Sequence, residues 1–113
     1  NFANLARGRE RCLPTIVDGY RALRDLGTVD AQWLSKVEPK MVLAMQAWGS
    51  LQRRGDIPDK FSRTLEKDAK AFDKAAKKNS YDEAMQAFEK YLQDLPDIGP
   101  GGTGKINWDN PTR

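Results

Sequence analysis

The chain contains 113 residues, 39% of them hydrophobic and 31% charged, with a formal net charge of +3 at pH 7. A chain of this length buries roughly two thirds of its unfolded surface, so we expect one domain that needs no metal or disulfide. It has no histidine, the side chain that most readily moves protons near neutral pH, and its one cysteine excludes an internal disulfide. Composition therefore favours a binding protein over an enzyme.

The apolar residues occur in short groups along the whole chain. None approaches the roughly 20 consecutive apolar residues of a membrane-spanning helix, and the positive charge is too mild to favour nucleic acid as a partner. Because the sequence opens at Asn1 without an initiator methionine, we expect that a targeting segment has been removed, although a trimmed fragment would look the same.

The first helical pattern lies between residues 5 and 23, where apolar side chains recur at spacings of three, four and seven. Pro14 interrupts it, so either the helix kinks there or residues 2–12 form a separate piece. Gly27 closes the helix in the usual C-terminal position. The apolar face consists of Leu5, Cys12, Leu13, Ile16, Val17, Tyr20 and Leu23.

The second pattern follows directly. Thr28 or Asp30 caps its start, and Pro39 divides a short helix from a longer one that begins near Glu38. Gly55 breaks the chain after it. Its apolar face consists of Trp33, Leu34, Val37, Met41, Met45, Trp48 and Leu51.

The third and fourth patterns carry most of the charge. Residues 58–78 contain seven basic and four acidic side chains, and residues 79–99 contain one basic and five acidic, so the two helices should attract each other. The third starts after Asp56 and ends at Asn79. Its apolar positions are Phe61, Leu65, Phe72 and Ala76, and its i,i+4 charge pairs are Asp59 with Arg63, Glu66 with Lys70, and Asp73 with Lys77.

The fourth pattern opens with a capping box. In Ser80-Tyr81-Asp82-Glu83 the Ser80 hydroxyl accepts from the amide of residue 83, and the Glu83 carboxylate reaches back to the amide of Ser80. Pro96 stops the helix. Its apolar face consists of Tyr81, Ala84, Phe88, Tyr91, Leu92 and Leu95.

Short connectors force neighbouring helices to run antiparallel, which predicts an all-α, up-down-up-down four-helix bundle over residues 1–96. Residues 97–113 form a flexible Pro/Gly-rich C-terminal tail. Within it, residues 99–106 match G-x-x-x-x-G-K of a phosphate-binding loop, but Ile106 replaces the hydroxyl residue and no strand precedes the motif. We therefore interpret this segment as a hinge.

No residue pattern supports catalysis, a cofactor or a metal site. The chain lacks a Cys/His ligand set, and Asp94, Asp97 and Asp109 lack the spacing of a calcium loop. The acids Asp82 and Glu83 are explained by the dipole of the helix they begin, and Glu89 by solvation. A small hydrolase that uses Asp82 or Glu83 stays a minor alternative.

Two features are candidates for binding a partner protein. Trp108 follows the glycine hinge, and either anchors the tail to a partner or folds back on the bundle. Clustered basic side chains could dock an acidic protein surface in a salt-sensitive way, or could simply be solvated and paired internally. These side chains are Arg7, Arg9, Arg11, Arg53, Arg54, Lys74, Lys77 and Lys78.

Several of these segments together resemble a known family. The arginine-rich first helix around Arg11-Cys12-Leu13, the proline-interrupted segments, and the stretches Tyr81-Asp82-Glu83-Ala84 and Ala87-Phe88-Glu89-Lys90-Tyr91-Leu92 look like the PsbQ-like extrinsic subunits of photosystem II. Within that class the chain looks most like the extrinsic subunit of diatoms. The resemblance covers residues 5–96, and the glycine-rich tail departs from it.

The resemblance implies a protein of the chloroplast thylakoid lumen, peripheral to the membrane and monomeric when free. It implies binding to the photosystem II core and to other extrinsic subunits. The implied role is to stabilise the oxygen-evolving complex and help retain calcium and chloride, without ligating the metals. The alternative is a helical adaptor or assembly factor that binds another protein through its basic surface or its Trp108 tail.

Overall fold

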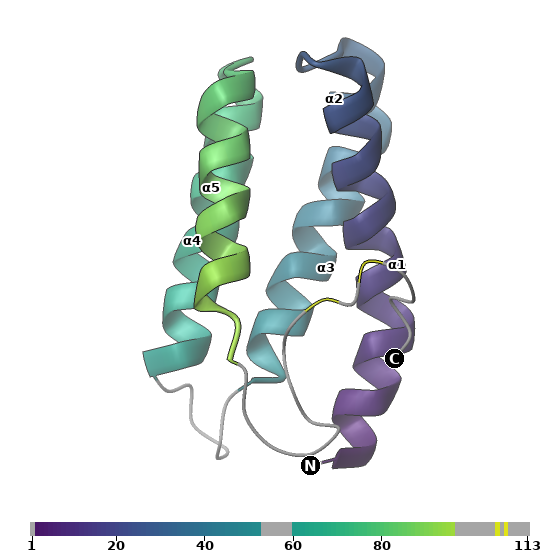
Figure 1. The fold of residues 1–113 in the computed structure, drawn as a ribbon, viewed down its shortest axis with the longest axis vertical. Helices are drawn as coiled ribbons and strands as arrows, with labels where there is room; N and C mark the ends of the chain where they lie inside the picture. Colours follow the sequence, from purple (N-terminus) through teal and green to yellow (C-terminus); the bar gives the residue numbers. More distant parts are fainter. Residues whose placement is uncertain (1, 53–59, 97–105, 107, 109–113) are drawn as a thin grey trace.

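The computed structural model describes residues 2–52, 60–96, 106 and 108, with the side chains of all of these except 2–6 and 61. All regular secondary structure in this part of the chain is helical (Figure 1). This confirms the all-α prediction. None of the helices in these ranges has the length and apolar character that crossing a membrane requires. The five helices are α1 (Phe2–Leu26), α2 (Ala31–Lys36), α3 (Glu38–Ser50), α4 (Lys60–Lys77) and α5 (Tyr81–Asp94).

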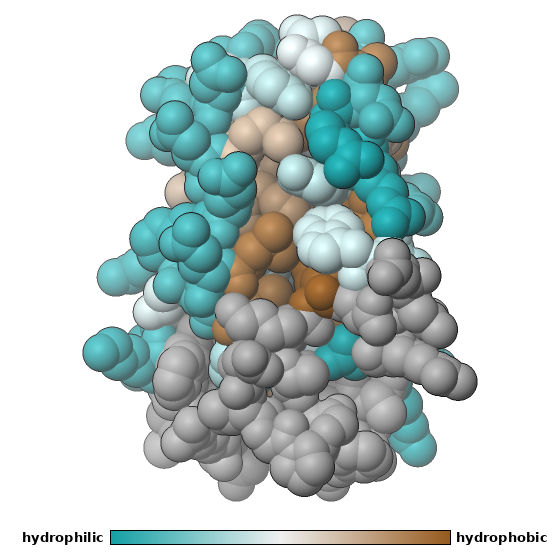
Figure 2. Space-filling view, viewed as in Figure 1, coloured by the Kyte–Doolittle hydropathy of each residue, from teal (hydrophilic) through white to brown (hydrophobic). Residues whose placement is uncertain are grey.

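The long helices lie side by side and successive ones run in opposite directions (Figure 1). Close backbone contact joins α1 to α3, α3 to α4 and α4 to α5, with the short α2 packed on α3. Between α5 and α1 a strip of apolar side chains is flanked by hydrophilic side chains of both helices (Figure 2). The helix α4 therefore has neighbours on two sides and leaves its remaining face outward.

The predicted proline and capping features of the N-terminal half hold in part. The helix α1 is continuous through Pro14, so residues 2–12 are not a separate piece. The Asp30 carboxylate caps α2 by accepting from the amides of Gln32 and Trp33, and Pro39 lies in the first turn of α3. As predicted, the second pattern is thus a short helix followed by a longer one that begins at Glu38.

The turn between α4 and α5 is built around Asn79. Its φ of 59° is left-handed, which asparagine tolerates better than most residues. The amide of Asn79 donates to Ala76 O, and the amide of Ser80 donates to Ala75 O, as in a Schellman motif. Ser80 then begins α5, because its hydroxyl accepts from the Glu83 amide at 3.3 Å.

Half of the predicted capping box is therefore wrong. The Ser80 amide donates to Ala75 O at the end of α4 instead of to the Glu83 carboxylate. That carboxylate contacts Lys78 Nζ at 3.0 Å. The Ser80 amide, which the capping box requires as a donor to Glu83, is thus already bonded to the end of α4, because only three residues separate the two helices.

The core contains the apolar faces that the sequence predicted. Trp33, Trp48, Phe72, Phe88 and Tyr91 are all buried, whereas the side chains of Leu5 and Phe61 lie outside the described set. Two of the buried polar aromatic side chains donate to backbone oxygens: Tyr91 Oη donates to Met45 O at 2.7 Å and Trp33 Nε1 donates to Gly19 O at 3.0 Å. Buried Cys12, Leu13, Ile16, Leu23, Met41, Met45, Leu65, Ala69, Ala76 and Leu95 complete much of this core.

Glycine allows α3 to approach α4 closely. A Cβ atom on Gly49 would lie 2.9 Å from Leu65 Cβ, an atom fixed close to the α4 backbone. Relief of that overlap requires the two helices to move apart, because Leu65 is fully buried.

We predict that Gly49→Ala lowers the free energy of unfolding by about 1 kcal/mol, because overpacking of about 1–3 kcal/mol outweighs the gain of about 1 kcal/mol in helix propensity. Urea denaturation followed by circular dichroism measures the change. Ser50→Ala, at the exposed neighbouring position, is the control and should have a smaller effect. A Gly49→Ala protein more stable than the wild type would contradict the close approach.

Candidate docking surface

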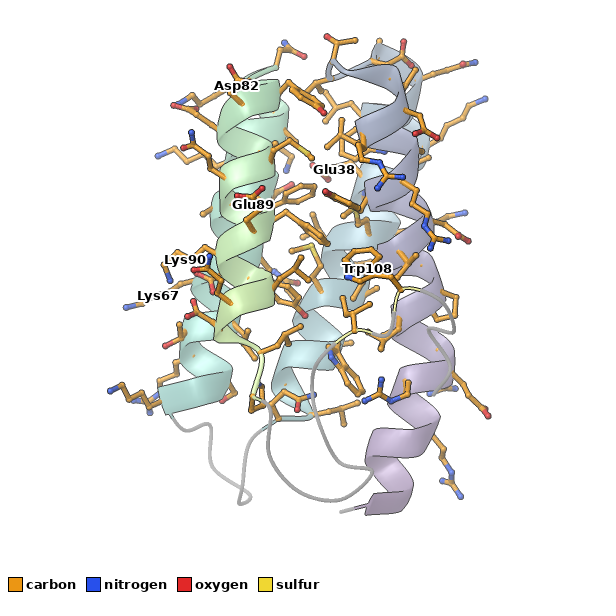
Figure 3. All side chains as sticks on the ribbon, in the orientation of Figure 1. Glu38, Lys67, Asp82, Glu89, Lys90 and Trp108 are labelled. Atoms are coloured by element: carbon orange, nitrogen blue, oxygen red, sulfur yellow. The ribbon has the colours of Figure 1, made fainter. Side chains whose placement is uncertain are left out.

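The outward face of α4 carries a regular series of cations. Six basic side chains follow one another at spacings of three, four, three, four and three residues. On a helix this alternation keeps all six within an arc of about 100°. Lys67 points away from the other helices (Figure 3). We call this set the cationic face of α4; its members are the exposed Lys60, Arg63, Lys67, Lys70, Lys74 and Lys77.

The acids of α4 lie to the sides of this face. Glu66 bonds Lys70 Nζ and Asp73 bonds Lys77 Nζ, each at 3.1 Å, which confirms two of the predicted i,i+4 pairs. The third pair involves Asp59, which lies outside the described residues. Asp68 is buried and faces α5. The cationic face consequently contains no acidic side chain within its arc.

The structure places the basic side chains that the sequence singled out in different environments. Lys74 and Lys77 belong to the cationic face, and Lys78 follows it and pairs with Glu83 of α5. Arg53 and Arg54 lie outside the described residues. The other four members of the cationic face, Lys60, Arg63, Lys67 and Lys70, were not among the predicted docking residues, although their spacing of three and four residues is visible in the sequence.

Arg9 is a correction to the predicted docking set. Arg7 and Arg11 are exposed on α1, but Arg9 is only 5% exposed. Its guanidinium carbon lies 5.2 Å from the centre of the Trp48 ring on α3, a cation–π contact. Burial lowers the pKa of Arg9. Arg9 therefore joins α1 to α3 and does not present its charge to a partner.

Trp108 lies against the bundle. Its ring is half-buried, 5.3 Å from the centre of the Tyr20 ring on α1 and 6.3 Å from that of Phe88 on α5 (Figure 3). The Tyr20 and Phe88 rings stack at 4.5 Å, and Arg21 donates to the carbonyl oxygen of Trp108 at 2.6 Å. Of the two alternatives for Trp108, the geometry favours folding back on the chain over anchoring a partner.

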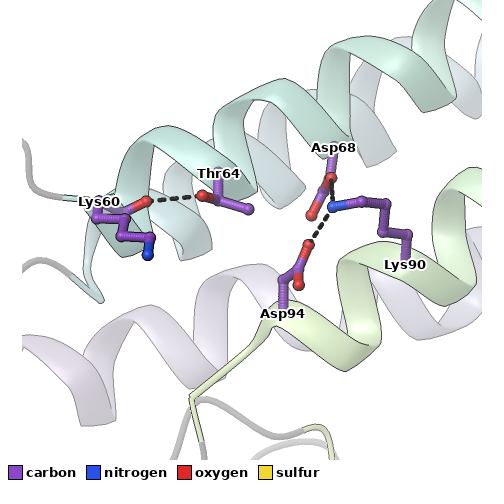
Figure 4. Close-up of polar contacts among 5 residues, drawn as sticks. All are labelled: Lys60, Thr64, Asp68, Lys90 and Asp94. Atoms are coloured by element: carbon purple, nitrogen blue, oxygen red, sulfur yellow. Dashed lines mark hydrogen bonds and ion pairs between the residues drawn. The ribbon is translucent and has the colours of Figure 1, made fainter.

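Two buried carboxyl groups lie beside α4, one on each side. Asp68 of α4 is 4% exposed. Lys90 Nζ of α5 donates to Asp68 Oδ1 at 3.0 Å and to Asp94 Oδ2 at 2.6 Å (Figure 4). Glu38 of α3 is 2% exposed and points to the interior beside Asp73 of α4 (Figure 3). Each buried acid thus has a second carboxyl group as its neighbour.

One oxygen of each buried acid lacks a conventional donor. Glu38 Oε2 and Asp68 Oδ2 accept no hydrogen bond from the described side chains or backbone. Each is satisfied if its carboxyl group keeps a proton and donates it to the neighbouring carboxylate. Burial, then the hydrogen bond and charge of Asp73, raises the pKa of Glu38 to about 7. Burial, then the hydrogen bond with Asp94, raises the pKa of Asp68 to about 6.

Each buried carboxyl group has one other carboxyl group and one lysine as its charged neighbours. No group of three or more potential metal ligands occurs among the described His, Cys, Asp and Glu residues. Glu83, one of the two acids of the hydrolase alternative, is exposed, and its hydrogen bond and charge interaction with Lys78 lower its pKa. A general acid needs the opposite shift.

Comparison of the chain with protein-family models, with curated proteins and with solved structures finds no match.

We predict that the free energy of unfolding falls by on the order of 1–3 kcal/mol between about pH 5 and pH 8. Below the usual pKa of 4.5, Glu38 makes its full contribution to the free energy of unfolding. This contribution is lost as the pH rises to about 7, because the folded protein holds a proton there that the unfolded chain has already released. Asp68 likewise lowers the free energy of unfolding as the pH rises from 3.8 to about 6.

Glu38→Gln with Asp68→Asn tests this pH dependence, because both amides stay neutral. Urea denaturation at the two pH values should show a smaller slope for this double variant and higher stability than the wild type at the higher pH. Glu66→Gln, at an exposed position of α4, is the control and should keep the wild-type slope. An unchanged slope in the double variant would exclude these two groups as the cause.

We predict that Trp108→Ala lowers the free energy of unfolding by about 1–2 kcal/mol, because it removes a half-buried aromatic contact with two helices. Thermal and urea denaturation measure the loss, with Gln86→Ala at an exposed position of α5 as the control. If Trp108→Ala is as stable as the control, the ring does not contribute to the stability of the bundle. That result would favour the alternative that Trp108 anchors the tail to a partner protein.

Proposed function

We propose that this protein is a non-catalytic docking subunit that binds a larger protein assembly through exposed basic side chains. The observation that carries this proposal is the separation of charge on α4, where the cations point outward and the acids lie at the sides or inside. A surface of one sign raises the rate of association with a surface of the opposite sign and fixes its orientation.

We further propose that the architecture is an up-down-up-down four-helix bundle over residues 1–96, followed by a C-terminal arm over residues 97–113. In this interpretation α2 and α3 together form the second arm of the bundle. The alternating directions of α1, α3, α4 and α5 support it (Figure 1). Trp108, which belongs to this arm, contacts Tyr20 and Phe88 of the bundle.

The assembly we propose is photosystem II. The support is the resemblance of residues 5–96 to the PsbQ-like extrinsic subunits, together with an all-helical fold and a basic outer face. The protein would bind the lumenal side of the complex, peripheral to the thylakoid membrane, and contact the core and other extrinsic subunits. It would stabilise the oxygen-evolving complex and support calcium and chloride retention by covering the site, with no cofactor of its own.

The adaptor alternative has another protein as its partner, bound through the basic surface or through the Trp108 tail. The packing of Trp108 against α1 and α5 argues against the tail as its main ligand, because binding through Trp108 would first have to break those contacts. An adaptor would then use the same basic surface. A pull-down with a peptide of residues 97–113 separates the two forms of this alternative.

We predict that the protein rebinds to photosystem II membranes from which the extrinsic subunits have been removed, and that it raises their oxygen evolution. Binding should be saturable at low salt and should weaken as ionic strength rises, because exposed charges are screened within about 10 Å at 0.1 M salt. Co-sedimentation measures binding, and oxygen release from the pellet measures function. The absence of saturable binding at low salt would exclude photosystem II as the partner and leave the adaptor alternative.

A further inference from the structure

The six cations of α4 form two rows that differ in their local partners. Lys60, Lys67 and Lys74 follow one another at intervals of seven residues, and so do Arg63, Lys70 and Lys77. Seven residues are two turns of helix, so neighbouring members of a row lie about 10.5 Å apart along the axis. We call these the first row and the second row.

The second row is partly neutralised within α4. Lys70 bonds Glu66 and Lys77 bonds Asp73, each acid four residues before its lysine. No first-row lysine lies within 4.0 Å of a carboxylate oxygen among the residues that the structure describes, although the charge of Lys74 acts on Glu83 of α5. The difference follows from the sequence, because positions three or four residues from Lys67 and Lys74 hold no acid.

A shallow groove between α4 and α5 lies beside Lys74, the last member of the first row. Lys74 and Lys78 line one edge of it, and Glu83 and Lys90 of α5 line the other. Its floor includes the small side chains of Ala71, Ala75 and Ala87, which let another backbone approach closely. The first row and the groove together offer charge and shape to an elongated ligand.

The chemistry of this face favours an acidic protein segment over a lipid surface. The large exposed hydrophobic side chains of the described residues are Leu26 on α1 and Leu43 on α3, so the described side chains of α4 include no large apolar anchor for a bilayer. The neighbouring acids Glu66 and Asp73 would also repel a continuous sheet of anionic headgroups. A protein segment can place separate carboxylates on the first row and avoid both acids.

We propose that the first row, Lys60, Lys67 and Lys74, with the adjoining α4–α5 groove, is the docking surface of this protein, and that its ligand is an acidic segment of another protein. This inference rests on the proposed docking function and assigns it to one face. A helical ligand matches the first row when it carries carboxylates at intervals of seven residues, because its carboxylates are then spaced along their helix as the lysines are along α4.

The direct test compares two double variants with the same loss of charge. Lys67→Gln with Lys74→Gln removes two cations of the first row, and Lys70→Gln with Lys77→Gln removes two cations of the second. Both pairs lie on α4 at the same spacing, and glutamine keeps the helix propensity of lysine. Thermal denaturation followed by circular dichroism verifies that both variants are folded.

The partner-independent probe is poly-L-glutamate, with binding measured at about 150 mM salt so that only short-range pairs contribute strongly. We expect the first-row variant to lose about tenfold in affinity and the second-row variant less than about threefold, because Glu66 and Asp73 already occupy the second row. Equal losses, or no loss in either variant, would overturn the proposal. Stronger binding of the wild type to phosphatidylglycerol vesicles than to poly-L-glutamate would overturn it in favour of a lipid surface.

The same variants applied to stripped photosystem II membranes separate this inference from the proposed function. If the wild type binds poly-L-glutamate through the first row but does not bind the membranes, the first row is still the docking surface, but photosystem II is not the partner. If the wild type binds the membranes and the first-row variant binds equally well, photosystem II stands as the partner and the assignment of the face is wrong.

Discussion

The packing of α4 between α3 and α5 is the constraint on which the rest of the structure depends. One side of α4 must approach α3 closely enough that Gly49 has no room for a side chain, and its other side must accept α5. The buried positions Leu65, Ala69, Phe72 and Ala76 meet this requirement. What remains of the helix circumference is a single outward arc, and that arc holds the cations. Charge separation on α4 is thus a geometric result of having two helical neighbours.

The same packing explains why carboxyl groups are buried on both sides of α4. Asp68 and Asp73 occupy the borders between the core and the cationic arc, where each meets a neighbouring helix. Each border contains two carboxyl groups and one lysine, so one proton per border restores neutrality. The borders and the outward face are therefore electrostatically linked, since ionisation of Glu38 or Asp68 adds negative charge directly beside the cations.

Local patterns in the sequence predicted the helices well because the controlling interactions lie within a few residues. The apolar stripes, the division at Glu38 and the turn at Asn79 are of this kind. The environment of Arg9 could not be predicted in this way, because Trp48 comes from another helix.

The candidate site was less accessible to sequence reasoning for two reasons. Glu38 resembles a solvated acid at a helix start, and only tertiary packing buries it against Asp73. The cationic face was visible as a spacing of three and four residues, but summing charge over the whole helix concealed it, because the sum cancels acids that point elsewhere. A count resolved by helix face would have found Lys60, Arg63, Lys67 and Lys70.

The contact between Arg21 and Trp108 bears on the order in which the protein folds. It joins residues 87 positions apart, whereas α4 and α5 are joined by a turn of three residues. Local pairs close first because a short loop loses less entropy on closure. The α4–α5 hairpin can therefore form before Trp108 docks, so the apolar strip between α1 and α5 is the last part of the core to be covered. Until Trp108 docks, this strip is exposed apolar surface of the kind that makes partly folded chains prone to aggregate.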